Sequence, residues 1–564
     1  MNTMKRSTGL DRRKFLTGTT AGLGGAALLA GGGNAFAATA KPGPRPANPS
    51  IGPVTVTPSD QQYQDSVRAL NARYVGRPDS VHFVDAPEQI PAVVERAVRE
   101  GKRLTVRSGG HCLEDFVYNS DVRTVLDVSH MNAVSYDPAR RAIAVESGAT
   151  LLDLYETLYQ AWGITVPGGI CYSVGVGGHV SGGGWGMLAR RDGLVVDHLY
   201  AVEVVVVDAS GRARTVLATR EKDDPHRELW WAHTGGGGGN FGVVTRYFFR
   251  SPDAVGADPR TLLPKPPAEV LLSAVSWPWA KLSRNGFARL TQNYASWHVA
   301  HGAADSPQRF LTSFLILNHQ ANGQIGLVTQ MDAGAPGAQR MLDEYLAHMG
   351  RGVGIGRGAL TRQMGDIGPM PQFAAARRLP WLQATRFVGT TNPLLNDPTL
   401  RAEYKSAYMR AEFPRTHLDT LYKHLTRTDI ASPNLNIQLT PFGGAVRRVS
   451  QDATAAGHRG AAFKMLWSAQ WNDPADDATY VAWTRESYQE VYARTGGVPV
   501  PDDVTDGCYV NYPDADLSDP KYNTSGVPWH ELYYKDAYPR LQRIKKAYDP
   551  RNVFRHRQSV ELPN

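Results

Sequence analysis

A histidine and a cysteine stand side by side in the segment VRSGGHC at residues 106–112, directly after a short β-branched run. Such a pair could bind a metal ion or act as a nucleophile with its base. Neighbouring side chains on an extended segment point apart, however, which is poor geometry for both kinds of site. The sequence holds no C-x-x-C pair and no H-E-x-x-H motif that would complete a metal site. An isolated histidine beside a turn is more often a surface or capping residue, so this segment alone leaves the role of His111 open.

Two glycine-rich segments indicate a second kind of chemistry. They occupy residues 167–186 and 234–249, and the first has nine glycines in the nineteen positions 168–186. Glycine lacks a Cβ atom, so such density is expected where backbone must approach a ligand closely. Neither the G-x-G-x-x-G fingerprint after a strand nor the G-x-x-x-x-G-K-[ST] loop is present, which excludes the Rossmann and P-loop modes of binding. Consecutive backbone N–H groups can still cradle a pyrophosphate.

Two tyrosines, Tyr509 and Tyr512, stand in the segment CYVNYPD near the C-terminal end. Tyrosines in such runs are commonly strand residues that pack against their neighbours. A phenol has an unperturbed pKa of about 10. To act as a base near neutrality it needs positive or hydrogen-bonding neighbours, and the sequence does not name them.

These residues need elements that position them, and the pattern before residue 111 predicts a βαβ-like unit. A strand, a proline-opened helix that ends at Gly101 and a strand at Leu104–Val106 follow one another. The apolar positions of that helix are Ile90, Val93, Val94 and Ala97.

Further elements are predicted on both sides of the glycine segments. The sequence predicts strands at Thr124–Val128, Ala142–Glu146 and Val202–Val207, and a helix capped by Thr150 that runs to about Gln160. Near the C-terminus we expect a strand-like piece at GCYVNY, then an acidic loop, then a helix. The apolar face of that helix carries Tyr538, Leu541, Ile544 and Tyr548.

The chain of 564 residues is 42% hydrophobic and 20% charged, which suits a large ordered protein of more than one domain. Residues 1–37, with paired Arg12 and Arg13 and a short Ala/Gly/Leu run, resemble a twin-arginine export signal. That pathway carries folded proteins, often with a cofactor installed. Residues 38–58 are Pro-rich and predict an extended linker. Beyond about residue 250 the sequence carries long amphipathic stretches, many tryptophans and Pro/Gly breaks, and we expect a second domain at 251–500.

Charge and cysteine content exclude some classes of protein. Removal of residues 1–37 takes away five Lys/Arg and one Asp, so the formal charge falls from +8 to +4. This weak excess, without a basic block, gives no case for nucleic acid as a partner. The three cysteines, Cys112, Cys171 and Cys508, are too few for a disulfide scaffold. No transmembrane segment is expected.

Four motifs occur in one order on this chain: RSGGH, GGICYSVGVGGHVSGGGWG, GGGGGNFGVVT and YVNYPDADL. Together they resemble the berberine-bridge-enzyme-like family of flavin oxidases, within the vanillyl-alcohol-oxidase, PCMH-type FAD fold. The resemblance is strong over residues 70–250 and 505–560 and loose over 251–500. It implies an α+β fold, with a two-part FAD-binding domain at 70–250 that is completed by residues 505–558. The substrate domain at 251–500 would be an antiparallel sheet covered by helices.

The resemblance also implies the cofactor, an FAD bonded through His111 to its 8α-methyl carbon and through Cys171 to ring carbon C6. Imidazole nitrogen and thiolate are suitable nucleophiles for such bonds. The residues expected to contact FAD without a bond are Arg107, Ser108, Gly109 and Gly110 on one side, Gly175, Gly177, Gly178, Ser181 and Gly182 on the other, and Gly242 and Val243 at the adenine end. His179 is expected to lie near the cofactor without being bonded to it. Cys112 and Cys508 are expected to be unreactive free thiols, and a disulfide between them is the less favoured alternative.

By the same resemblance, Tyr512 accepts the substrate's hydroxyl proton, with Tyr509 as the second choice. The segment NLNIQLTPFGG at 434–444 is expected to face the substrate with Gln438; it holds no carboxylate, which argues against a glutamate base there.

The predicted protein is an exported FAD-dependent oxidase of hydroxyl- or hemiacetal-bearing carbons that uses O2 and releases H2O2. Its substrate would be a sugar, an aromatic alcohol or a secondary metabolite. The alternatives are oxidative cyclisation or dehydrogenation of a secondary metabolite, a dehydrogenase that avoids oxygen, and a binding protein with an inactive flavin fold.

Overall fold

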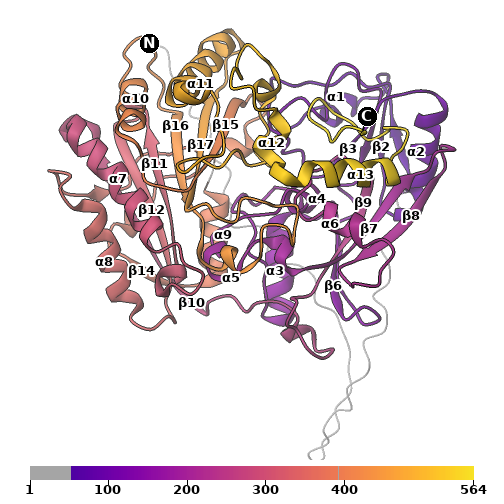
Figure 1. The fold of residues 1–564 in the computed structure, drawn as a ribbon, viewed down its shortest axis with the longest axis horizontal. Coiled ribbons are helices and arrows are strands. Elements are labelled where there is room, and N and C mark those ends of the chain that lie inside the picture. The colour runs from indigo at the N-terminus through magenta and orange to yellow at the C-terminus, as the bar shows by residue number, and fades with distance from the viewer. Residues whose placement is uncertain (1–51, 392, 564) are drawn as a thin grey trace, which may run out of the picture. The chain divides into compact units, whose positions relative to one another are not determined.

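The computed structural model describes residues 52–391 and 393–563 (Figure 1). The predicted export signal and the first part of the linker lie outside the described residues. The described strands form three sheets, and those before and after residue 250 belong to different sheets.

The first sheet contains the predicted βαβ-like unit. Its order is β1-β2-β4-β3, with β1 at Val54–Val56, β2 at Ser80–Phe83, β3 at Leu104–Arg107 and β4 at Thr124–Asp127. Strand β4 pairs in parallel with β2 and with β3. The crossover helix α2 (Ile90–Arg99) buries all four of its predicted apolar residues, which confirms that part of the sequence analysis.

A five-stranded antiparallel sheet follows, in the order β5-β6-β9-β7-β8. Its strands are β5 (Val134–Asp137), β6 (Ala142–Glu146), β7 (Leu199–Val207), β8 (Ala213–Thr219) and β9 (Val243–Phe249). Helix α3 (Leu151–Trp162) begins at the predicted cap, because the Thr150 side chain accepts a hydrogen bond from the Asp153 N–H. It ends at Gly163, whose φ of 68° is left-handed.

The third sheet is antiparallel and has the order β13-β10-β12-β11-β16-β17-β15, with β14 also paired to β10. Its strands are β10 (Glu269–Pro278), β11 (Leu311–Asn318), β12 (Gln324–Asp332), β13 (Gly358–Ala359), β14 (Arg377–Pro380), β15 (Arg401–Met409), β16 (Leu435–Pro441) and β17 (Phe463–Trp471). The expected antiparallel sheet is therefore confirmed.

Helices cover one face of this sheet: α7 (Arg284–Ala300), α8 (Ala338–Gly350), α10 (Arg415–Leu425) and α11 (Asp477–Val491) (Figure 1). Side chains alternate along β17, since successive residues of a strand point to opposite faces. Trp467 contacts Tyr488 of α11, so the residues at 464, 466, 468 and 470 point to the other face of the sheet.

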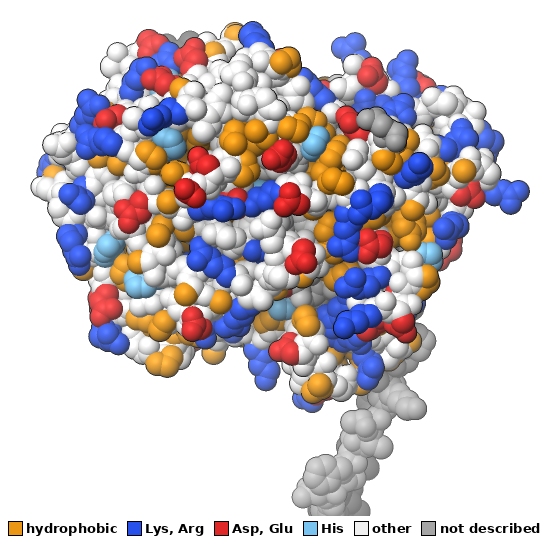
Figure 2. All heavy atoms as spheres, in the orientation of Figure 1, with side chains coloured by type: hydrophobic (Ala, Val, Ile, Leu, Met, Phe, Trp, Pro, Cys, Tyr) orange, Lys and Arg blue, Asp and Glu red, His pale blue; other side chains and the backbone are white. Residues whose placement is uncertain are grey.

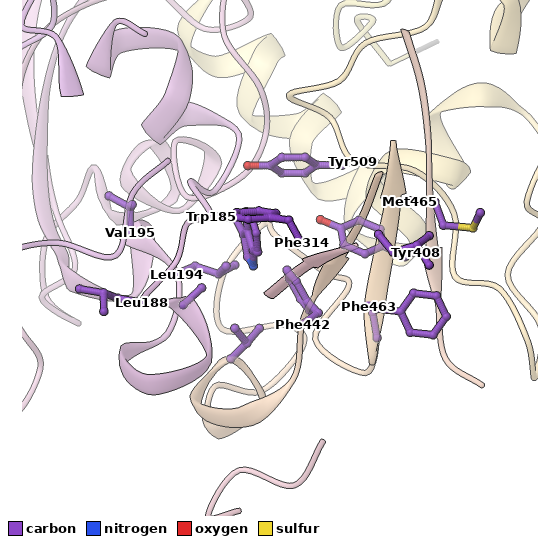
Figure 3. Close-up of a cluster of buried hydrophobic side chains, with 14 of the residues drawn as sticks. Trp185, Leu188, Leu194, Val195, Phe314, Tyr408, Phe442, Phe463, Met465 and Tyr509 are labelled. Carbon is purple, nitrogen blue, oxygen red and sulfur yellow. The ribbon is translucent and has the colours of Figure 1, made fainter. Parts of the chain in front are cut away.

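Trp185 and Arg190 connect the glycine-rich segment to the third sheet. Trp185 packs edge-on against Phe314 of β11, with Phe442 and Tyr509 in the same cluster (Figure 3), and its indole N–H donates to the carbonyl oxygen of Pro441 at 3.1 Å. The buried guanidinium of Arg190 donates to the carbonyl oxygens of His301, Leu311 and Phe442. These contacts fix the end of β16 against residues 185–190.

The C-terminal segment returns to the first sheet, and here one prediction is wrong. Residues 507–512 form no strand; their backbone hydrogen bonds go instead to a tight turn, with the Tyr512 N–H donating to Tyr509 O, and to other segments. Pro513 cannot continue a strand ladder, because it lacks an N–H group. The predicted last helix, α13 (Tyr538–Tyr548), is present with all four apolar residues buried, and Phe554 pairs with Leu104 of β3.

The remaining helices are short, except for α9: α1 (Tyr63–Ser66), α4 (Val176–Ser181), α5 (Ala189–Asp192), α6 (Arg227–Ala232), α9 (Trp381–Thr390) and α12 (Trp529–Tyr534). Within the described ranges, no helix has the length and apolar character needed to cross a membrane. On the face drawn in Figure 2, basic and acidic side chains are interspersed.

Candidate active site

A cavity of about 390 Å³ lies among the segments that the motifs had singled out. Its lining includes two sets of residues of different kinds. The glycine lining consists of residues 107–111, the positions 175, 177, 178 and 181, and residues 237–242. The sheet lining consists of side chains from four neighbouring strands of the third sheet: Phe314, Tyr404, Gln438, Thr440, Leu466 and Gln470. A volume in this range is typical of small-molecule sites.

The glycine lining is built by backbone packed against backbone. A Cβ atom on Gly109 would lie 2.3 Å from the Gly175 nitrogen, and one on Gly175 would lie 2.2 Å from the Ser108 Oγ. Such distances are far below normal contacts, so both positions require glycine. The Ser108 hydroxyl donates to Ser147 O at 2.7 Å, and Gly110 has a φ of 74°. The turn that carries His111 is thereby fixed against the segment that carries Cys171.

His111 and Cys171 both line the cavity. Burial, with a smaller contribution from Arg107, lowers the pKa of His111 to about 4, so its imidazole is neutral; Nε2 lies 2.9 Å from the Ser173 Oγ. Burial and the charge of Asp366 raise the pKa of Cys171. The thiolate expected from the sequence is therefore disfavoured at this position, because the surroundings are apolar and the nearby charge is negative.

Tyr512, Tyr509 and Gln438 also line the cavity. The rings of the two tyrosines meet edge to face with their centroids 5.0 Å apart. Burial raises the pKa of Tyr512 well above its usual value. The turn at residues 509–512, rather than the expected strand, directs both rings to the same space.

Lys464 of β17 is a candidate functional residue that the sequence analysis missed. Its Nζ lies 3.4 Å from the Tyr512 Oη and is 4.0 Å, 4.5 Å and 4.7 Å from the ring centroids of Trp185, Tyr509 and Tyr512. Three aromatic faces favour the ammonium form, but burial is the larger effect and lowers the pKa of Lys464 well below its usual value. The sequence does hold a signal, a lysine at an inward position of the apolar strand FKMLWSAQW.

This chain is similar to known proteins in sequence and in structure. Two family models match, one described as FAD binding domain at residues 78–216 and one as berberine and berberine like at 508–561. The aclacinomycin-N/aclacinomycin-A oxidase of Streptomyces galilaeus is 47% identical over 560 residues, covering 98% of each chain. The hexose oxidase of Chondrus crispus is 31% identical over 537 residues, 89% of this chain and 93% of that one. The solved structure of glycopeptide hexose oxidase DBV29, complexed with teicoplanin, is 44% identical with a TM-score of 0.84, covering 91% of this chain and 100% of that one.

This chain belongs to the berberine bridge enzyme-like family of FAD-linked oxidases. It is an FAD-dependent oxidoreductase with an α+β fold.

The glycine lining fits the FAD of this family. A Cβ atom on Gly178 would meet no heavy atom within 4 Å, although the residue lines the cavity, so its backbone faces the enclosed space. Gly237, Gly239 and Gly242 have φ values of 83°, 72° and 158°, which few other residues adopt. Arg107 also lines the cavity, and its guanidinium pairs with the buried carboxylate of Asp127.

Two of the predicted cofactor contacts lie outside the cavity lining. A Cβ atom on Gly182 would lie 1.9 Å from the Asn511 Oδ1, so this glycine admits Asn511 rather than a ligand. The Asn511 amide donates to the His179 carbonyl and to the Tyr509 hydroxyl, which fixes the tyrosine turn. Val243 points into the core beside Val205 and Val207. The family resemblance implied both contacts, and in the structure neither residue is part of the cavity lining.

His179 and the other cysteines have structural surroundings. The His179 Nε2 accepts a hydrogen bond from the Gly169 N–H at 3.1 Å, which holds the segment before Cys171. Cys112 and Cys508 are free thiols, so the alternative of a disulfide between them is wrong. Burial raises the pKa of Cys112 to about 11 and that of Cys508 to about 12, and both stay protonated.

Proposed function

We propose that this oxidoreductase is an oxidase of hydroxyl- or hemiacetal-bearing carbons, with Tyr512 and Lys464 as its proton-accepting pair. The observation that carries the proposal is that Tyr512 lines the cavity and that its Oη lies 3.4 Å from the Nζ of the buried Lys464. When bound, FAD supplies the hydride acceptor and returns the electrons to O2 as H2O2. The protein has to place the substrate carbon and to remove the hydroxyl proton.

Lys464 would allow Tyr512 to accept a proton, which the buried phenol does not do by itself. A buried phenol with a raised pKa accepts a proton only if it also gives up its own. The Lys464 amine can take that proton, because burial lowers its pKa. Whichever of the two groups holds the shared proton beforehand, the pair becomes phenol plus ammonium after it takes one proton from the substrate.

The proposal includes two bonds to the flavin, from His111 to the 8α-methyl carbon and from Cys171 to C6. Both residues line one cavity, and the imidazole is neutral. Two tethers would hold the cofactor without a closed pocket and so allow a bulky substrate. The names of the relatives favour such substrates, since one is an oxidase of aclacinomycins and another was solved with teicoplanin. Dehydrogenation or cyclisation of a secondary metabolite by the same site is therefore the second candidate.

The attachment is tested by the mass and absorption spectrum of the denatured protein. We expect flavin to stay attached in wild type, in His111→Ala and in Cys171→Ala, and to be lost only in the double variant. Release from the wild type on denaturation would contradict the proposal.

The reaction is tested by anaerobic mixing with sugars and aromatic alcohols, followed by admission of air. Bleaching of the flavin absorbance by an alcohol and release of peroxide in air are expected. Bleaching without reoxidation in air would indicate a dehydrogenase, and bleaching only by a polyketide or alkaloid would favour the second candidate.

We also propose a division of labour along the chain, in which residues 70–250 and 505–558 bind FAD and residues 251–500 bind the substrate. Residues 38–58 would be a linker. Residues 1–37 would direct export of the protein by the twin-arginine route. The motif with Arg12 and Arg13 supports export. Replacement of both arginines by lysine should stop the appearance of the protein outside the cytoplasm, and unchanged export would refute this route.

A further inference from the structure

The turn that carries His111 is in direct contact with the segment that carries Cys171. A Cβ atom on Gly109 would lie 2.3 Å from the Gly175 nitrogen and 2.8 Å from the Ser173 carbonyl oxygen, so backbone packs on backbone. One side-chain contact is added to this packing, because the Ser173 Oγ lies 2.9 Å from the His111 Nε2. The two residues proposed to bond the flavin are thus connected through a serine two positions after Cys171.

Residues 169–174, which we call the cysteine segment, are fixed by helix α3. The Tyr155 hydroxyl of this helix donates to the Gly169 carbonyl oxygen at 2.8 Å. At the start of the same helix, the Leu151 N–H donates to the Val174 carbonyl oxygen at 3.0 Å. The serine hydroxyl that meets the imidazole therefore stands on a fixed support.

The contact with Ser173 distinguishes the two nitrogens of the His111 ring. His111 lines the cavity and Ser173 does not, so the serine lies behind the imidazole. Within the described residues, Nε2 has Ser173 as its partner and Nδ1 makes no hydrogen bond. Because burial keeps the imidazole neutral, one nitrogen carries a proton and the other a lone pair.

Attachment of a flavin through its 8α-methyl group forms one C–N bond and removes two hydrogens. One comes from the methyl group and the other is the N–H hydrogen of the imidazole, while the two electrons pass through the flavin to O2, which becomes H2O2. The bonding nitrogen needs a lone pair, and Nδ1 has one when Nε2 carries the proton. A serine hydroxyl can accept from Nε2–H before the bond forms and donate to Nε2 after this proton has left.

We propose that Ser173 is the residue that positions His111 for attachment of the flavin, by holding Nε2 so that Nδ1 forms the bond to the 8α carbon. This inference rests on the proposed function, which includes the bond itself. Ser173 acts through His111 and not on the flavin, in the way that hydrogen-bond partners behind a reacting imidazole fix its orientation and tautomer. The bond of Cys171 to C6 does not depend on this contact.

The test measures each bond separately. In Cys171→Ala the histidine bond is the only proposed tether, and in His111→Ala the cysteine bond is the only one. Each variant is produced with and without Ser173→Ala, and the share of flavin that precipitates with the acid-denatured protein is followed after the start of expression. We expect Ser173→Ala to slow attachment about 10- to 100-fold in the Cys171→Ala protein, because Nε2 loses its partner. In the His111→Ala protein it should change nothing.

Two further variants and a second measurement show whether the hydroxyl acts through the imidazole. Ser173→Thr keeps the hydroxyl and should restore attachment, and Ser210→Ala, which removes an exposed hydroxyl, should leave it unchanged. NMR of the flavin-bearing peptide from the Cys171→Ala protein identifies the bonded nitrogen. We expect Nδ1 when Ser173 is present and a mixture of Nδ1 and Nε2 in its absence, a ratio that a merely structural serine would not change.

The outcomes separate this inference from the proposed function. Equal rates of histidine attachment with and without the serine hydroxyl would overturn the role of Ser173 and leave the bond intact. Equal slowing of both bonds would also overturn it, since it would indicate a general disturbance of the cysteine segment. Release of all flavin from denatured Cys171→Ala would refute the histidine bond of the proposed function, and this inference with it. Equal flavin content before denaturation and an unchanged melting temperature exclude misfolding as the cause.

Discussion

The two linings of the cavity are made in opposite ways. The glycine lining offers backbone, and its contacts depend on the absence of side chains, as at Gly109 and Gly175. The sheet lining offers side chains held on rigid strands, with Gln438 on β16 and Gln470 on β17. A backbone lining suits a group that is the same in every turnover. A side-chain lining can be changed residue by residue without altering the fold, which suits a substrate that differs between relatives.

The largest expected effect comes from placing a side chain in the glycine lining. In Gly175→Ala the new Cβ would meet the Ser108 Oγ at 2.2 Å and the Gly109 nitrogen at 2.3 Å, so the two segments must separate. We expect the purified variant to carry less than about a tenth of the wild-type flavin, because overpacked backbone has no room to relax. Flavin absorbance per protein measures this. Gly350→Ala at the end of α8, where a Cβ would meet nothing within 4 Å, should keep full loading. Normal loading of Gly175→Ala would mean that the backbone contact is not required.

The second-largest effect is expected from removing the hydroxyl group of Tyr512, the proposed proton acceptor. Tyr512→Phe removes the hydroxyl that contacts Lys464 and should slow flavin reduction about 100- to 10,000-fold, the usual contribution of a positioned acid or base. Flavin content should stay normal, since the ring remains in place. Stopped-flow reduction under anaerobic conditions is the measurement, with Tyr509→Phe as the matched variant. A larger loss in Tyr509→Phe would transfer the role of base to Tyr509.

A smaller effect is expected from replacing Lys464 of β17, the partner of Tyr512 in the proposed proton-accepting pair. Burial lowers the pKa of Lys464, so in the wild type the reduction rate should rise as the pH rises through that lowered value and then level off. In Lys464→Met only the raised pKa of Tyr512 remains, which moves the rise to higher pH and lowers the rate at pH 7 about 10- to 100-fold. Rates of flavin reduction between pH 5 and 10 check this, and Lys281→Met, an exposed lysine, should leave the profile unchanged. An unshifted profile in Lys464→Met would remove Lys464 from the proton transfer.

The smallest effect is expected from replacing Thr150, which caps helix α3 beside the glycine lining. Thr150→Ala removes the cap of α3, next to the pairing of Thr150 with Gly175, and should cost about 1 kcal/mol of stability. Thr150→Ser keeps the capping oxygen and is expected to retain most of the stability. Thermal unfolding measures the difference, and flavin loading should be normal in both variants. Equal losses in the serine and alanine variants would show that the cap is not the cause.

Local patterns predicted most of the FAD-binding half. The helix face Ile90, Val93, Val94 and Ala97, the cap at Thr150 and the last helix at Tyr538–Tyr548 follow from apolar spacing and capping chemistry within about a dozen residues. Such short-range rules failed at residues 507–512, where aromatic residues suggested a strand. There the backbone takes its partners from distant segments, such as Leu532 for the Cys508 N–H.

The sequence motifs by themselves pointed to the glycine lining and to the pair of His111 and Cys171, because close backbone approach and the proposed covalent attachment restrict the residue type at fixed positions. Only the tertiary structure brought Lys464 to Tyr512 and Asp366 to Gln470, from segments that lie 48 and 104 residues apart. It also turned Gly182 toward Asn511 and Val243 into the core. A side chain on a strand gains its role from the neighbours that sheet pairing and loop packing provide, and those neighbours leave no local pattern in the sequence.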